Sequence, residues 1–198
     1  SDAGGSIRGP AAYTGLVGLK PSQGRIPRKN GFGNFSVQGN LTRSVADTAR
    51  LLDVPAGPDD RDRQSLPPPG ISYETAIETL DVAGLRAVWS EDLGFAAVDP
   101  EVAAIARGAA ERLIEAAALR EEREAFRPAN ILRPWVIVML SNLREDLTRD
   151  GFLPDGLDRL APSTRFMLAR ADLARGTIPM PEAWATIHRL EQDMAGFF

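Results

Sequence analysis

The first 25 residues constrain this chain more than any other stretch, because glycine and proline limit where its backbone can turn. Gly4 and Gly5 come directly before Ser6, and glycine accepts backbone conformations and close approaches that a side chain prevents. A serine after such a pair is well placed to meet a ligand. Residues 7–15 have a proline near the start and a glycine at the end, which predicts a short helix beginning close to Ser6.

The amides around Ser6 form a candidate site for negative charge. The first N–H groups of a helix have no acceptor within the helix, and the helix dipole favours an anion at this end. We therefore expect backbone amides to stabilise an oxyanion above Ser6. Besides that of Ser6, the expected donors are the N–H groups of Ala3, Gly4 and Gly5. Asp2 and Arg8 flank the serine, and we expect them to pair and brace the loop.

Two motifs follow one another in this opening stretch. Ser-Asp-Ala-Gly-Gly-Ser-Ile-Arg-x-Pro-Ala is followed by Gly-Leu-Val-Gly-Leu-Lys-Pro-x-x-Gly-Arg. Together they resemble the amidase signature family. The resemblance continues in order through residues 39–47, 56–59 and 85–90, so it covers about the first half of the chain. It implies an α/β fold in which helices cover a mixed central β-sheet, present only in part in this chain.

The resemblance also implies an enzyme, an amidase that hydrolyses carbon–nitrogen bonds. Family members use a serine nucleophile, a second serine with a cis peptide, and a lysine; they need no cofactor. Ser6 matches the nucleophile, so an acyl-enzyme intermediate and a backbone oxyanion hole are expected at Ser6. The family's lysine and second serine precede this motif, and the chain begins five residues before Ser6. We therefore expect an interior piece of a longer amidase, inactive alone.

The two lysines of the chain do not replace the missing base. Lys20 belongs to the Gly-Leu-Lys-Pro motif, where the resemblance gives it a structural place. Lys29 lies in a glycine-rich stretch, residues 29–40, that we interpret as a surface or substrate-facing loop. The only histidine, His188, lies beside apolar residues of a predicted helix, where a partly buried structural histidine is the commoner case.

Three other interpretations stay open. Ser6 could be a helix cap whose hydroxyl only accepts a backbone hydrogen bond. The chain could be a binding module that kept the Gly-Gly-Ser turn without catalysis. It could also be the glutamine amidotransferase subunit of the same family, but residues 32–40 do not resemble the Ser-Leu-Asp-Gln-x-Gly stretch of that branch. A general amidase is favoured.

Composition excludes several other classes. The 198 residues carry a formal charge of −4, are 43% hydrophobic and contain no cysteine. Scattered arginines give no basic surface for nucleic acid, and without cysteine or a second histidine a metal site is not expected. No apolar run approaches the ~20 residues that span a bilayer. We expect a cytoplasmic location and, as partners, a small amide substrate and the remainder of the polypeptide, with a homo-oligomer left open.

We expect all 198 residues to belong to one amidase domain with four segments. Residues 1–54 are the signature core, 55–72 an exposed connector rich in proline and charge, 73–125 a layer of strand and helix, and 126–198 a helical segment on the substrate side. Hydrophobic periodicity, caps and breakers predict strands within residues 15–28 and at 85–90. They predict helices at about 45–54, 73–80, 99–116, 131–148, 163–175 and 181–198.

Two details of these segments bear on packing. In the helix that starts after Asp99, one face is predicted to pack on a sheet; its residues are Val102, Ile105, Ala109, Leu113 and Ala116. The charged run at residues 120–124 replaces the Gly-x-x-Val pattern that precedes the next strand in the family. This replacement counts against a strand there.

The helical segment after residue 126 supplies the candidate substrate pocket. Its helix at 131–148 is apolar on nearly every side, so it must be buried on several sides or line an apolar cavity. The candidate pocket residues are Trp135, Met139, Phe166 and Met167. If they cover Ser6, the preferred substrates carry aryl or alkyl groups. The alternative is that they are ordinary core residues far from the serine.

Overall fold

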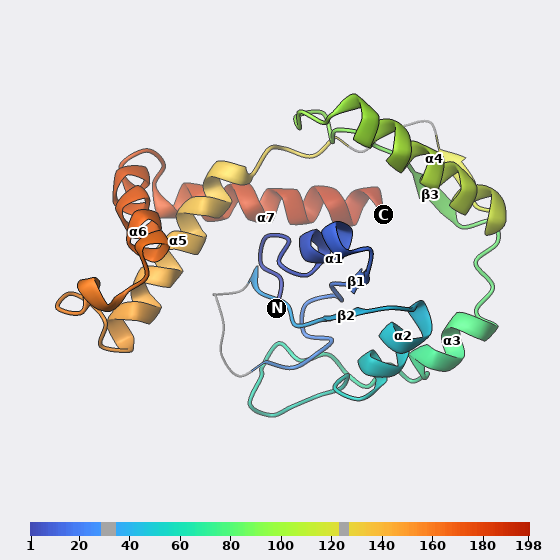
Figure 1. Ribbon diagram of the computed structural model, residues 1–198, viewed down its shortest axis with the longest axis horizontal. Helices are drawn as coiled ribbons and strands as arrows, with labels where there is room; N and C mark the ends of the chain where they lie inside the picture. The colour runs from blue at the N-terminus through green and yellow to red at the C-terminus, as the bar shows by residue number, and fades with distance from the viewer. Residues whose placement is uncertain (29–34, 123–126) are drawn as a thin grey trace. The chain divides into compact units, whose positions relative to one another are not determined.

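Helices and two short strand pairs make up the chain in a computed structural model, which describes residues 1–28, 35–122 and 127–198 (Figure 1). The chain divides into two compact units. The first unit comprises Ser1–Leu80 with Ser141–Ala161, and the second Asp81–Leu140 with Pro162–Phe198. The boundary at residues 140 and 141 falls within one helix, α5 (Leu132–Arg149). This division does not test the four segments predicted from the sequence, which stay a prediction.

The first unit begins with the segment that carries Ser6 and with helix α1 (Arg8–Thr14). The helix ends at Gly15, whose φ of 65° is left-handed, as the proline and glycine pattern predicts. Strand β1 (Val17–Leu19) pairs antiparallel with β2 (Asn40–Thr42). Ile7 and Ala11 are buried, so the apolar side of α1 helps to form the core of this unit.

Helices α2 (Val45–Asp53) and α3 (Tyr73–Thr79) lie side by side in the first unit (Figure 1). Both were predicted, and the Ser44 side chain caps α2 by accepting a hydrogen bond from the Asp47 amide. The Asp53 carboxylate at the end of α2 accepts hydrogen bonds from the Tyr73 and Glu74 amides. A carboxylate at a helix N-terminus is stabilising, so α2 helps to hold the start of α3.

In the second unit, strand β3 (Arg86–Val88), helix α4 (Pro100–Ala116) and strand β4 (Arg120–Glu122) follow one another. The two strands pair in parallel, with Arg86 opposite Arg120. The doubt about a strand after residue 119 was therefore wrong for residues 120–122, while residues 123 and 124 lie outside the described residues. Backbone hydrogen bonds form this pair, and ion pairs accommodate its charged side chains.

The helix predicted after Asp99 is present, but its predicted packing face is wrong. Asp99 caps it by accepting hydrogen bonds from two amides, whereas Val102, Ile105 and Leu113 are 58%, 65% and 61% exposed. The opposite side carries buried Ala103 and Arg107, whose guanidinium pairs with Glu121 of β4 at 2.7 Å. The predicted face therefore lies on the exposed side of α4, and the ion pair of Arg107 with Glu121 lies on the other side.

Three helices complete the described chain: α5, α6 (Pro162–Arg175) and α7 (Met180–Phe197). Helix α6 begins at Pro162, one residue before the predicted start at residue 163, and ends at Arg175 as predicted. Several apolar residues of these helices are buried, namely Ile137, Val138, Leu140, Leu168, Ala171, Ala183 and Ile187. The predicted burial of the apolar helix around residue 137 is confirmed. No described helix has the length and apolar character needed to cross a membrane.

Candidate active site

A buried carboxylate organises the loop that carries Ser6. The side chain of Asp2 is fully buried. It accepts backbone hydrogen bonds from Gly5 at 2.6 Å, Ile7 at 3.2 Å and Arg8 at 3.3 Å. The Arg8 guanidinium adds two bonds, at 3.0 Å from Nε and 3.1 Å from Nη2. The expected pair of Asp2 and Arg8 is therefore present, and Asp2 also holds the backbone on both sides of Ser6.

This arrangement favours the ionised form of the carboxyl. The Arg8 guanidinium is the main cause that lowers the pKa of Asp2 well below its usual range, and the three amides lower it further, against the opposing effect of burial. Asp2 therefore stays charged at neutral pH. A charged acceptor forms stronger hydrogen bonds than a neutral one, so the loop is held firmly.

The backbone of Asp2 ties the loop to a second segment. Asp2 donates to the Val37 carbonyl at 2.8 Å and accepts from the Val37 amide at 3.0 Å. Val37 and the preceding Ser36 are both buried. Of the two alternatives for residues 29–40, a surface loop is therefore wrong for these two residues, and a substrate-facing loop stays a prediction; residues 29–34 lie outside the described residues. Sequence periodicity carried no signal for this pairing, because an isolated bridge has no repeat.

Ser6 occupies an exposed position just before the helix. Ile7, not Ser6, is the N-cap residue of α1, and the Asp2 carboxylate accepts the hydrogen bonds of the Ile7 and Arg8 amides. Gly5 has a φ of 110°, which side chains rarely allow. The Ser6 hydroxyl makes no hydrogen bond to a described residue. Helix capping therefore does not account for this serine, and its hydroxyl is accessible.

The loop amides fall into two groups. The Gly5 N–H donates to Asp2 Oδ1, so in this conformation it is used within the loop. The amides of Ala3, Gly4 and Ser6 donate to no acceptor among the described residues. The expected oxyanion donors are thus reduced to these three amides, and Gly5 instead shapes the turn that presents them.

None of the possible bases in the described chain hydrogen-bonds to Ser6. The Lys20 ammonium donates to the Pro21 carbonyl at 3.0 Å, and Lys29 lies outside the described residues. His188 is exposed, with its ring 5.6 Å from the Trp184 ring, so it is not the partly buried histidine that was expected. The described residues also contain no cluster of three or more metal-ligand side chains.

The four candidate pocket residues belong to the second unit, whereas Ser6 belongs to the first. Trp135 and Met139 of α5 are half-buried. Phe166 and Met167 of α6 are 64% and 38% exposed, and the Arg170 guanidinium lies 5.5 Å from the Phe166 ring. Both helices thus present apolar side chains that are incompletely covered, and their place beside Ser6 remains a prediction.

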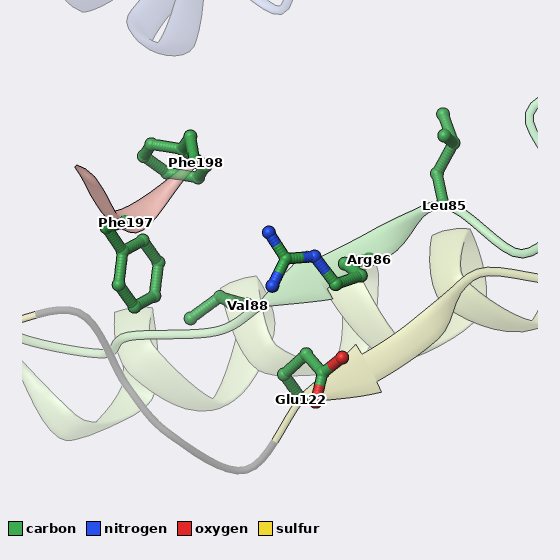
Figure 2. A pocket seen from close by; sticks show the side chains of 6 residues that line it. All are labelled: Leu85, Arg86, Val88, Glu122, Phe197 and Phe198. Carbon is green, nitrogen blue, oxygen red and sulfur yellow. The ribbon is translucent and has the colours of Figure 1, made fainter. Parts of the chain in front are cut away.

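A cavity of about 350 Å³ lies within the second unit. Figure 2 shows Phe197 and Phe198 at the end of α7 facing the side of the β3 and β4 pair that carries Arg86, Val88 and Glu122. Among the described residues that line it there is no candidate site residue and no hydroxyl nucleophile. This cavity therefore does not compete with Ser6 as a reactive centre.

Comparisons with known proteins bear on the whole chain. A family model described as Amidase matches residues 1–168. The chain is 47% identical over 108 residues to an acylamidase of Rhodococcus erythropolis, covering 53% of this chain and 22% of the relative. It is 37% identical over 155 residues to a glutamyl-tRNA(Gln) amidotransferase subunit of Moorella thermoacetica, covering 76% and 32%. The chain therefore belongs to the Amidase family.

Comparison with solved structures agrees with this family assignment. The structure of a 6-aminohexanoate cyclic dimer hydrolase matches 97% of this chain with a TM-score of 0.75 and 28% identity, and the match covers 41% of that protein. The α/β fold expected from the resemblance is confirmed. The chain spans less than half the length of each of these proteins.

Proposed function

We propose that this chain supplies the nucleophile segment of a serine amidase, with Ser6 as the attacking residue. One observation carries the proposal: the buried Asp2 carboxylate holds Gly5 and the start of α1, while the Ser6 hydroxyl stays exposed beside three unused amides. This arrangement suits nucleophilic attack on a carbonyl, because donors stand ready for the oxygen that becomes charged.

The proposed reaction has two stages. Ser6 Oγ attacks the amide carbon, and the amides of Ala3, Gly4 and Ser6 stabilise the tetrahedral oxyanion. A base takes the proton of Ser6 and passes it to the amine, and the carbon–nitrogen bond breaks as the amine departs. The acyl group stays on Ser6 until water hydrolyses it. From the family resemblance, the base is a lysine acting through a second serine, both outside these 198 residues. The proposal keeps the cofactor-free chemistry and the cytoplasmic location expected from the sequence.

Replacement of Ser6 by alanine in the complete polypeptide tests the proposal. Because the nucleophile is lost, we expect hydrolysis of simple aryl and alkyl amides to fall about ten-thousandfold or more. Ser6→Ala should leave the melting temperature nearly unchanged, since the hydroxyl bonds no described residue. Activity retained within a factor of about two would show that Ser6 is not the nucleophile, whereas no hydrolysis by the unchanged polypeptide would favour the non-catalytic binding module.

A second function within the family is that of a glutamine amidotransferase subunit. The 37% identity over 155 residues to such a protein favours it, whereas the higher identity over a shorter stretch is to an acylamidase. The apolar candidate pocket on α5 and α6 supports an acyl-directed amidase. Comparison of glutamine with a phenylacyl amide as substrates separates the two: preferred hydrolysis of glutamine would establish the second function.

A further inference from the structure

The connector, residues 55–72, is held at both ends. Asp53, just before it, accepts a hydrogen bond from the Ser72 hydroxyl at 2.7 Å and another from the Tyr73 amide at 2.7 Å. The two ends of the connector therefore lie close together, as the ends of an Ω-loop do. Loops of this length without helix or strand are uncommon in compact domains and are often functional.

The middle of the connector is fixed by its own side chains. Asp62 accepts from the Gln64 amide at 2.9 Å, and the Ser65 hydroxyl donates to the Asp62 carbonyl at 2.7 Å. The same hydroxyl accepts from the Asp59 amide at 3.1 Å. Aspartate and serine commonly bond nearby amides in this way, and the result is a defined shape in a segment with no buried residue.

This fixed part, residues 59–66, is hydrogen-bonded to residues 23–28, which include the end of the second signature motif. Asp62 Oδ2 accepts from the Arg28 amide at 2.8 Å, and the Leu66 amide donates to the Gly24 carbonyl at 2.9 Å. Gln23 and Gln64 pair through their side chains at 2.9 Å. Gly24 has a φ of 77°, and a Cβ there would clash with the Gln64 carbonyl oxygen. Only glycine permits this contact.

Residues 23–28 are related to the loop that carries Ser6 through a shared cavity and a backbone pairing. A small cavity of about 40 Å³ is lined jointly by Asp62, Ile26, Arg28, Ser36 and Val37, among others. Val37 is the residue whose backbone pairs with Asp2 in both directions. Asp62 thus hydrogen-bonds to Arg28, Arg28 and Val37 line the same small cavity, and Val37 pairs with the residue whose carboxylate holds Gly5 and α1.

We propose that residues 59–66 form a positioning strap for the nucleophile loop, and that Asp62 is its main positioning residue. The strap holds residues 24–28 beside the cavity that Ser36 and Val37 also line, and in this way it maintains the position of Asp2 relative to Ser6. Asp62 does not touch substrate; it acts through Arg28 and Val37. The inference rests on the proposed role of Ser6, because a positioning effect is measured through that serine.

The test uses the complete polypeptide and an aryl amide substrate. In Asp62→Ala we expect kcat to fall about tenfold to a hundredfold, because a small displacement of a nucleophile is costly, while KM changes less than about twofold. Asp62→Asn keeps a carbonyl acceptor for the Arg28 amide and should recover part of the loss. Asp60→Ala is the matched control: this neighbouring aspartate is exposed and makes no hydrogen bond to a described residue.

Labelling with a serine-directed phosphonofluoridate separates positioning from unfolding. If the strap positions Ser6, the labelling rate falls in parallel with kcat in Asp62→Ala and Gly24→Ala, while the final labelled fraction stays at the wild-type value. If Asp62 only supports the fold, the final fraction falls and the rate of the remaining molecules is unchanged, which overturns the proposal. Unchanged kcat also overturns it. Activity retained in Ser6→Ala would instead refute the proposed function itself.

Discussion

The Ser6 loop with α1, residues 1–14, and helix α4 differ in what determines their packing. In the loop, the partners of the Asp2 side chain all lie within six residues along the chain. In α4, the cap is equally local, but the stripe of Val102, Ile105 and Leu113, which was predicted to be buried, is exposed. Local chemistry therefore decides where both helices begin, whereas the buried side of α4 depends on distant partners.

The largest effect is expected at Asp2. Asp2→Ala removes a buried carboxylate that five donors use, and each buried amide that is left without an acceptor costs about 1–3 kcal/mol. Urea unfolding of the complete polypeptide measures this loss, and reaction of Ser6 with an acylating probe should be lost as well. Asp60→Ala serves as the exposed control. A change below about 0.5 kcal/mol would mean that the loop does not depend on Asp2.

The pH dependence of this effect follows from the lowered pKa of Asp2. A carboxyl whose pKa is depressed in the folded state stabilises the protein above its unfolded pKa, which is about 3.9. The stability difference between wild type and Asp2→Asn should therefore be constant above about pH 5 and shrink as pH falls below about 4. A difference that changes between about pH 6 and 8 would show that another group titrates here.

The sequence predicts more of the loop than of the rest, for a physical reason. Proline and glycine mark both ends of α1, and Asp2 and Arg8 are close in sequence, so their pairing could be expected. The pairing of Val37 with Asp2 joins distant parts of the chain with no periodic pattern, and the fastening of Asp62 to Arg28 is equally distant. Strand β4 was doubted because a charged run replaces the family's Gly-x-x-Val pattern there. Its pairing depends on backbone hydrogen bonds, which do not require that pattern.

The next largest loss of stability is expected from a substitution in the exposed stripe of α4. If the remainder of the polypeptide covers this stripe, Ile105→Gln should destabilise the complete protein by about 1.5–3 kcal/mol, the value of one buried aliphatic side chain. Glu91→Gln, an exposed site between β3 and α4, is the control. Thermal unfolding compares the two. Equal and small changes would show that the stripe faces water in the complete protein.

The smallest effect concerns specificity. Met139→Ala and Met167→Ala should change the ratio of kcat/KM for a phenylacyl amide to that for acetamide by about 1–3 kcal/mol per lost pocket contact. This effect would arise if α5 and α6 cover Ser6 in the complete enzyme. Equal losses on both substrates, together with a lower melting temperature, would show that these methionines support the fold and do not contact the acyl group.

The most direct test of the central claim is to trap the acyl-enzyme. The complete polypeptide is mixed with a slowly hydrolysed aryl ester, quenched in acid and digested, and the peptides are analysed by mass spectrometry. We predict one acyl group on the peptide that contains the Gly-Gly-Ser motif, attached at Ser6, and no adduct in Ser6→Ala. An adduct on another residue, or an unchanged adduct in Ser6→Ala, would contradict the assignment of Ser6 as the nucleophile.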